Sequence, residues 1–216
     1  MHTNVCKPVG RTYRKTPVFS ATMTYLVLNP YWTVPPGILK NDVIPAVKKD
    51  INYLAPKKIK VLDQDGNVVD PKTVDWQVAK TGQYTFRQEP GIDNSLGLIK
   101  FMFPNVYNVY IHDTPAKELF EKTERIFSSG CIRIQKPFDL AEHLLQNQDG
   151  WDMERIKQST TPGSKPLTVN LKKTVTVHVL YLTAWGEEGK SVQFRKDVYE
   201  RDKAIATGLS ALPPEL

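Results

Sequence analysis

The sequence predicts a β-rich α+β fold, and three observations lead to this class. Short stretches rich in Val, Ile, Thr and aromatic residues recur, turn signals separate them, and strands and helices do not alternate regularly. Such strands pack as a sandwich or a barrel. The expected strands cover residues 5–12, 17–28, 58–62, 67–69, 83–87, 98–103, 106–111, 168–169, 175–182 and 191–195.

Few helices accompany these strands. The clearest is expected over residues 41–55, where Asn41 is placed to cap the helix and apolar residues recur at helical spacing. This apolar stripe comprises Ile44, Val47, Ile51 and Leu54. Shorter helices are expected over residues 115–121, 138–145 and 149–161, and the polar tail after residue 202 is expected to be frayed.

Length and composition fit one globular domain. The chain has 216 residues, of which 40% are hydrophobic, and this is enough for a single core. No run of about 18 apolar residues occurs, so we expect no membrane span. The first residues lack a charged segment followed by an apolar core, so we expect no signal peptide in this sequence.

The charge is basic, at +6 with a pI near 9.2, which makes nucleic acid a partner to consider. The Lys and Arg residues are scattered, and no motif interleaves them with base-stacking aromatic residues. We therefore interpret the charge as a solvated surface and expect no nucleic-acid partner.

The residues that carry chemistry gather in one stretch, 108–133. A β-prone apolar run ends at His112, which can accept and return a proton near neutral pH. Further along, Gly130 precedes Cys131, and Arg133 follows two positions later. A thiol, an imidazole, a permissive backbone and a guanidinium that binds planar anions are what acyl transfer through a thioester requires.

Structural explanations also exist for these residues. Cys131 could pair with Cys6 in a disulfide, and His112 could be a hydrogen-bonded residue at a strand end. We favour the catalytic interpretation because the thiol, glycine and arginine occur together. Two widely separated cysteines and scattered histidines do not form a zinc-ligand pattern, so no metal is expected.

Two segments extend this interpretation to a family. His-Asp-Thr-Pro at 112–115 and Ser-Ser-Gly-Cys-Ile-Arg at 128–133 resemble the L,D-transpeptidase catalytic domain, in particular its large periplasmic branch. The resemblance runs from about residue 10 to about residue 202. The commonest family motif has a histidine where this chain has Ser129, so no second catalytic histidine is expected.

The resemblance implies a β-sandwich with added helices, in which residues 32–90 form an inserted lid over the substrate groove. It also implies a periplasmic location, with the export signal and any wall-binding module upstream of this sequence. The implied substrates are peptidoglycan stem peptides that contain diaminopimelate, and carbapenems are expected to acylate Cys131. No cofactor is expected.

Roles for individual residues follow. Cys131 is the expected nucleophile, and His112, expected within hydrogen-bond reach of its sulfur at about 3–4 Å, is the base. A backbone carbonyl, that of Asp113, is expected to orient the imidazole, while the Asp113 side chain supports the next turn. The amides of Gly130 and Cys131 are expected to stabilise the oxyanion.

Four further residues are assigned to substrate binding. Arg133 is expected to hold a carboxylate or side chain of the stem, and Ser129 to hydrogen-bond the substrate. Tyr110 lies on the His112 face of its strand and lines the groove or packs in the core. Trp76 covers the substrate or belongs to the core of the lid.

The expected reaction is a 3→3 cross-link between two stem peptides. The same acyl-enzyme would serve a lipoprotein-anchoring enzyme or, with water as acceptor, an L,D-carboxypeptidase or endopeptidase. A non-enzymatic wall-binding domain is the remaining alternative.

Overall fold

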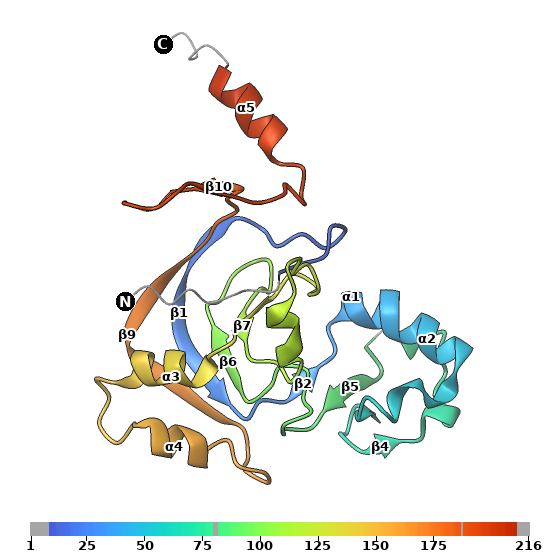
Figure 1. Cartoon of the computed structure of the whole chain (residues 1–216). Helices are drawn as coiled ribbons and strands as arrows, with labels where there is room; N and C mark the ends of the chain where they lie inside the picture. The colour runs from blue at the N-terminus through green and yellow to red at the C-terminus, as the bar shows by residue number, and fades with distance from the viewer. Residues whose placement is uncertain (1–8, 80–81, 187, 211–216) are drawn as a thin grey trace, which may run out of the picture.

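A computed structural model describes residues 9–79, 82–186 and 188–210 of the chain. Its main sheet has five strands in the order β8-β7-β6-β1-β9 (Figure 1). All neighbours pair antiparallel except β7 and β8, which are parallel. The strands are β1 (Phe19–Leu28), β6 (Ile99–Met102), β7 (Ile111–His112), β8 (Ile132–Arg133) and β9 (Leu167–Val179).

Strand β1 lies inside this sheet, where it pairs with the central strand β6 on one side and with the edge strand β9 on the other. Met23, Leu26 and Leu28 of β1 are buried in the larger of two apolar cores. A register shift between Met23 and Tyr25 lets β9 follow β1 over its whole length. Helices α3 (Pro137–Leu145) and α4 (Met153–Gln158) add Ala141, Leu145 and Ile156 to the same core.

Residues 32–90 form a second unit with its own sheet and its own apolar core. The sheet order is β2-β5-β3-β4, and the core includes Val47, Leu54, Val61 and Phe86. Figure 1 shows this unit to one side of the main sheet. Its elements are β2 (Trp32–Thr33), α1 (Pro36–Ile38), η1 (Leu39–Val43), α2 (Ile44–Lys49), η2 (Ile51–Leu54), β3 (Ile59–Leu62), β4 (Val68–Val69), η3 (Pro71–Thr73) and β5 (Thr85–Gln88).

The long helix expected over 41–55 differs from the observed one at both ends. Helical structure begins at Pro36, so Asn41 lies inside the π-helical turn η1 and does not cap the helix. Asp50 adopts an extended conformation and ends α2, and its carboxylate then caps the 3-10 helix η2 by accepting from the Asn52 amide. The apolar stripe still faces the core, because Ile44, Val47 and Leu54 are buried.

Two predicted strand boundaries were wrong. The segment 168–169 and most of the segment 175–182 form one strand, β9, which ends at Val179, because the polar residues between them occupy exposed positions of an edge strand. The expected strand 106–111 is reduced to β7, because the Asn105 amide nitrogen donates to the carbonyls of Phe103 and Val109 and stabilises a loop there. The expected helix at 115–121 is the 3-10 helix η5 (Lys117–Glu121).

The C-terminal segment is more ordered than expected. A hairpin of β10 (Ala184–Trp185) and β11 (Gln193–Phe194) leads to α5 (Asp202–Ser210), where a frayed tail was predicted. Figure 1 shows α5 extending away from the main sheet. Of the N-terminal strand expected at 5–12, residues 5–8 lie outside the described residues, and Gly10 forms a single bridge to Ser128. No helix in the described ranges has the length and apolarity needed to cross a membrane.

Candidate active site

The parallel pair of β7 and β8 brings the predicted site residues together. Ile111 lies opposite Ile132, and His112 lies opposite Arg133. Side chains alternate between the faces of a strand, so Tyr110 and His112 share one face with Cys131 and Arg133. All four line a cavity of about 940 Å³, which also extends to residues of the second unit such as Trp32 and Asp42.

Hydrogen bonds from side chains shape the loop before Cys131. Ser128 is buried, and its hydroxyl donates to the Cys131 carbonyl at 2.6 Å and accepts from the Gly130 amide at 3.1 Å. Thr16 donates to the Gly130 carbonyl at 3.0 Å. Gly130 has φ of +111°, a conformation that favours glycine. The Gly130 amide is therefore already engaged, whereas within the described chain the Cys131 amide has no acceptor.

Cys131 carries a free, half-buried thiol; Cys6 lies outside the described residues. Burial raises the pKa of the thiol. Hydrogen bonds from the amide and the hydroxyl of Tyr110 oppose this shift, as do the charges of Lys100 and Arg133. The sulfur also lies 3.9 Å from the carbonyl oxygen of Asn108. The resting group is thus a thiol surrounded by groups that favour its anion.

His112 is buried, and its Nδ1 lies 2.5 Å from the carbonyl oxygen of Asp113. Burial, together with the charges of Arg133 and Lys100, lowers the pKa of the imidazole to about 3, although hydrogen bonds to the Asp113 and Leu96 carbonyls oppose this shift. The ring is therefore neutral at pH 7. With Nδ1 as the donor, Nε2 holds the lone pair that a base needs.

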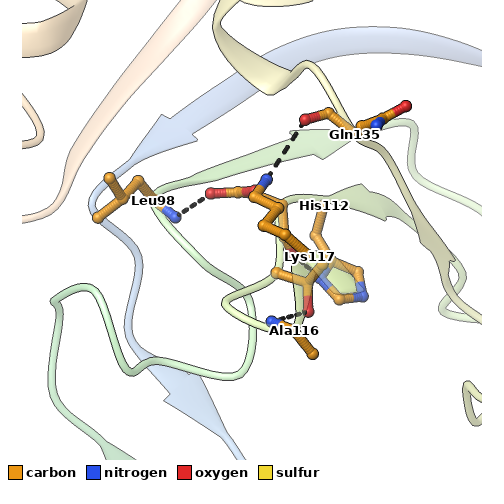
Figure 2. A network of polar contacts seen from close by, with 7 residues as sticks. Leu98, His112, Ala116, Lys117 and Gln135 are labelled. Carbon is orange, nitrogen blue, oxygen red and sulfur yellow. Dashed lines mark hydrogen bonds and ion pairs between the residues drawn. The ribbon is translucent and has the colours of Figure 1, made fainter. Parts of the chain in front are cut away.

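The Asp113 side chain points to the turn behind the ring. One carboxylate oxygen accepts from the Leu98 amide at 2.9 Å and the other pairs with Lys117. Lys117 also donates to the Gln135 carbonyl at 3.4 Å, and the Thr114 hydroxyl accepts from the Ala116 amide at 3.2 Å (Figure 2). The carbonyl of Asp113 therefore holds the imidazole while its carboxylate holds the turn.

The expected contact between sulfur and imidazole is not formed. No hydrogen bond joins the Cys131 sulfur to the His112 ring in the described structure, although both side chains line one cavity. In the parallel ladder Cys131 is adjacent to Tyr110, and Arg133 is adjacent to His112, so the thiol and the imidazole are diagonal neighbours. Catalytic hydrogen bonds are often long without substrate and tighten in the complex.

The residues expected to bind substrate divide between two places. The Tyr110 ring meets the His112 ring edge-on, with 5.7 Å between centroids. Ser129 accepts a hydrogen bond from Arg14 at 2.8 Å. Trp76 lies elsewhere, against Phe86 in the core of the second unit, and its ring nitrogen donates to the Pro71 carbonyl. The tryptophan that lines the cavity is Trp32.

Three basic residues of the site were missed in the sequence. Lys100 of β6 lies opposite His112, with its ammonium 4.0 Å from the centre of the Tyr110 ring. Arg11 and Arg14 enter the cavity from the N-terminal segment. Arg14 also pairs with Asp42 of the second unit at 2.7 Å. The alternation of Lys100 between buried Ile99 and Phe101 was visible, but it does not reveal which strands lie beside β6.

Metal ligands are a separate question. Within the described ranges, no group of three or more His, Cys, Asp or Glu side chains is arranged to hold a metal ion. The side chains around Cys131 are instead an imidazole, a phenol and cations. Such a set suits nucleophilic chemistry by the thiol itself.

Comparison with known proteins decides the family. The family model of the YkuD L,D-transpeptidase catalytic domain matches residues 7–177. The chain belongs to the L,D-transpeptidase family. The match includes Cys131, His112 and Arg133, and the β-rich fold agrees with the sandwich expected for this family.

One curated relative of this chain is a Haemophilus influenzae protein named "Putative L,D-transpeptidase". The two are 36% identical over 198 residues, which cover 91% of this chain and 40% of the relative. The chain thus spans about two fifths of the length of this relative.

Proposed function

We propose that this domain cross-links peptidoglycan stem peptides 3→3 through a thioacyl intermediate on Cys131. The observation that carries the proposal is the parallel β7–β8 register, which directs Cys131, His112 and Arg133 into one cavity. The neutral imidazole and the free thiol in that cavity suit acyl transfer at neutral pH.

The first step forms the thioester. As the donor stem binds, the Cys131 thiol turns to His112 and passes its proton to Nε2. The sulfur attacks the carbonyl that joins the L-centre of diaminopimelate to the terminal D-alanine. The Cys131 amide donates to the oxyanion. The carbon–nitrogen bond breaks, and His112 returns the proton to the departing amine of D-alanine.

The second step transfers the acyl group. The side-chain amine of diaminopimelate on another stem attacks the thioester, and His112 accepts a proton from this amine. The carbon–sulfur bond breaks and leaves the 3→3 amide, while the proton returns to the sulfur. No cofactor takes part in this scheme.

Residues 32–90 act as the lid in this proposal. They have their own core, and they contribute Trp32, Asp42 and Tyr53 to the cavity. A unit with a separate core can move as a body over a groove. The substrate is a wall polymer, so the same proposal places the domain in the periplasm.

Intact-mass spectrometry with a carbapenem tests the nucleophile. We expect the protein to gain the mass of one carbapenem, because the strained β-lactam acylates the thiolate. Cys131→Ala should gain nothing, and Cys131→Ser is the closer steric control. A wild-type mass that stays unchanged contradicts the proposal.

Product analysis on purified muropeptides tests the acceptor. We expect 3→3 dimers and released D-alanine from tetrapeptide stems. Tripeptides alone would indicate water as acceptor, and transfer only to a lysine-ended lipoprotein peptide would indicate an anchoring enzyme. No turnover together with an iodoacetamide-inert Cys131 would favour the non-enzymatic wall-binding alternative.

A further inference from the structure

Two arginines that line the cavity, half-buried Arg133 and exposed Arg11, form no ion pair with an acidic side chain among the described residues. Arg133 is half-buried, and its Nε is enclosed without a hydrogen-bond partner among the described residues. Leaving a buried donor of a charged group unpaired is costly. A ligand that accepts hydrogen bonds from the guanidinium would remove this cost.

Arg11 is placed beside the nucleophile loop by backbone pairing. Its amide donates to the Ser128 carbonyl at 2.9 Å, and the preceding Gly10 bridges to Ser128. The Arg11 guanidinium donates to the Tyr13 hydroxyl at 2.6 Å. Arg11 lines the same cavity as Arg133, and its charge lowers the pKa of Arg133. The two cations therefore face a common space.

The nearby acids do not neutralise this pair. Asp42 is within electrostatic range of Arg11 but forms its ion pair with Arg14. Glu118 acts on Arg133 only at a distance, since no ion pair joins them in the described chain. Asp93, another acid that lines the cavity, pairs with Lys58. The space between the two arginines thus has uncompensated positive charge.

We infer that Arg11 and Arg133 together form a carboxylate-binding subsite for the C-terminal D-alanine of the donor stem. This inference rests on the proposed function and names two residues that hold the leaving group. Guanidinium groups bind carboxylates through paired N–H donors, and two of them match a terminal carboxylate better than one.

Distance along the strand supports this ligand. Arg133 follows Cys131 by two residues on the same strand face, which corresponds to about 7 Å. The D-alanine carboxylate is the free carboxylate nearest to the scissile carbonyl along the stem. It belongs to the residue next to the attacked carbonyl, so the long Arg133 side chain can reach it while that carbonyl lies at the sulfur.

Alkylation by two reagents tests the charge of the subsite without any peptide. Iodoacetate is an anion and iodoacetamide is neutral, so the ratio of their rates with Cys131 reports the local potential. We expect Arg11→Gln to lower this ratio about threefold at low salt, with a smaller effect at high salt. Arg133→Gln should lower it too, whereas Arg195→Gln, which removes the same charge directly after β11, should not.

Arg11 is exposed, so Arg11→Gln is not expected to disturb folding, and thermal unfolding verifies this for every variant. An unchanged ratio in both cavity variants overturns the inference. This result does not depend on turnover, so the subsite can be established even where the proposed cross-linking fails.

A comparison of two substrates in each variant tests whether the subsite binds the D-alanine carboxylate. The kcat/KM values for a tetrapeptide stem and for the same stem with a D-alanine carboxamide are compared in each variant. In wild type, kcat/KM should be about tenfold or more higher for the carboxylate stem than for the carboxamide stem. Arg11→Gln should reduce this ratio. An equal preference in wild type and in Arg11→Gln overturns the assignment to the D-alanine carboxylate.

Discussion

Lys100 illustrates how a single charge acts on both the thiol of Cys131 and the imidazole of His112. Its ammonium lies over the Tyr110 ring, and it forms no ion pair in the described chain. The charge of Lys100 lowers the pKa of Cys131 and also lowers that of His112. One residue thus favours both the thiolate and the neutral base.

Replacing this charge should make the thiol less acidic. In Lys100→Met the pKa of Cys131 should rise, because a nearby cation that stabilised the thiolate is lost. The thiolate fraction at neutral pH then falls, and alkylation by iodoacetamide should slow about threefold to tenfold. The measurement is the alkylation rate between pH 6 and pH 10.

Two variants control this experiment. Lys100→Arg retains the charge and should restore most of the rate, and Lys60→Met removes a lysine that pairs with Glu89 in the second unit. A titration curve for Lys100→Met that overlays the wild-type curve contradicts the role of this charge.

At the scale of elements, the turn before β6 packs closely against the turn after β7. Gly97 has φ of +60°, and a Cβ atom there would overlap the Asp113 carboxylate. That carboxylate accepts from the Leu98 amide, and the Asp113 carbonyl holds the His112 ring. The orientation of the base therefore depends on close approach of two loops.

Adding one methyl group should disturb this contact. We expect Gly97→Ala to lower the free energy of unfolding by about 2–4 kcal/mol, from a strained φ and from steric overlap. It should also slow acylation by a carbapenem, because the Asp113 carbonyl moves. Urea unfolding and acylation kinetics measure the two effects.

Gly66→Ala is a matched control. Gly66 also has a positive φ, of +86°, but open space surrounds the position of its Cβ. This change should cost only about 1 kcal/mol and leave acylation as in wild type. Equal effects of the two alanine substitutions would show that overlap with Asp113 is unimportant.

At the scale of the whole molecule, the C-terminal segment supports the N-terminal segment beside Cys131. Tyr199 is buried, and its hydroxyl donates to the Gly10 carbonyl at 2.6 Å and accepts from the Thr16 amide at 3.3 Å. Thr16 in turn donates to the Gly130 carbonyl. Residues far apart in the sequence thus form one chain of hydrogen bonds that ends at the Cys131 loop.

Removing one hydroxyl tests this connection. Tyr199→Phe should lower the free energy of unfolding by about 1–3 kcal/mol, because two buried backbone groups lose their partner. Hydrogen exchange should also increase at the amides of Arg11 and Ser128. Tyr31→Phe is the control, because Tyr31 is exposed and contacts Arg87 through its ring, which phenylalanine retains. Unchanged exchange at both amides would contradict the connection.

The fold class and the family were predicted from local signals, and both are confirmed. Strand patterns and turn residues act within a few positions, and so does the motif around Cys131, which is why they are visible in a single sequence. The same signals were less accurate at boundaries. Asn41 looked like a cap, but the helix starts at Pro36. The tail after residue 202 looked frayed, but its described part, up to residue 210, forms α5.

The sequence by itself determined which residues are proposed to carry the chemistry, namely Cys131, His112 and Arg133. Only the tertiary structure decided their surroundings: that Lys100 lies opposite His112, that Arg11 lies beside the Cys131 loop, and that Trp32 rather than Trp76 lines the cavity. The physical reason is that strand pairing and packing join residues distant in the chain, and local propensity holds no information about those partners.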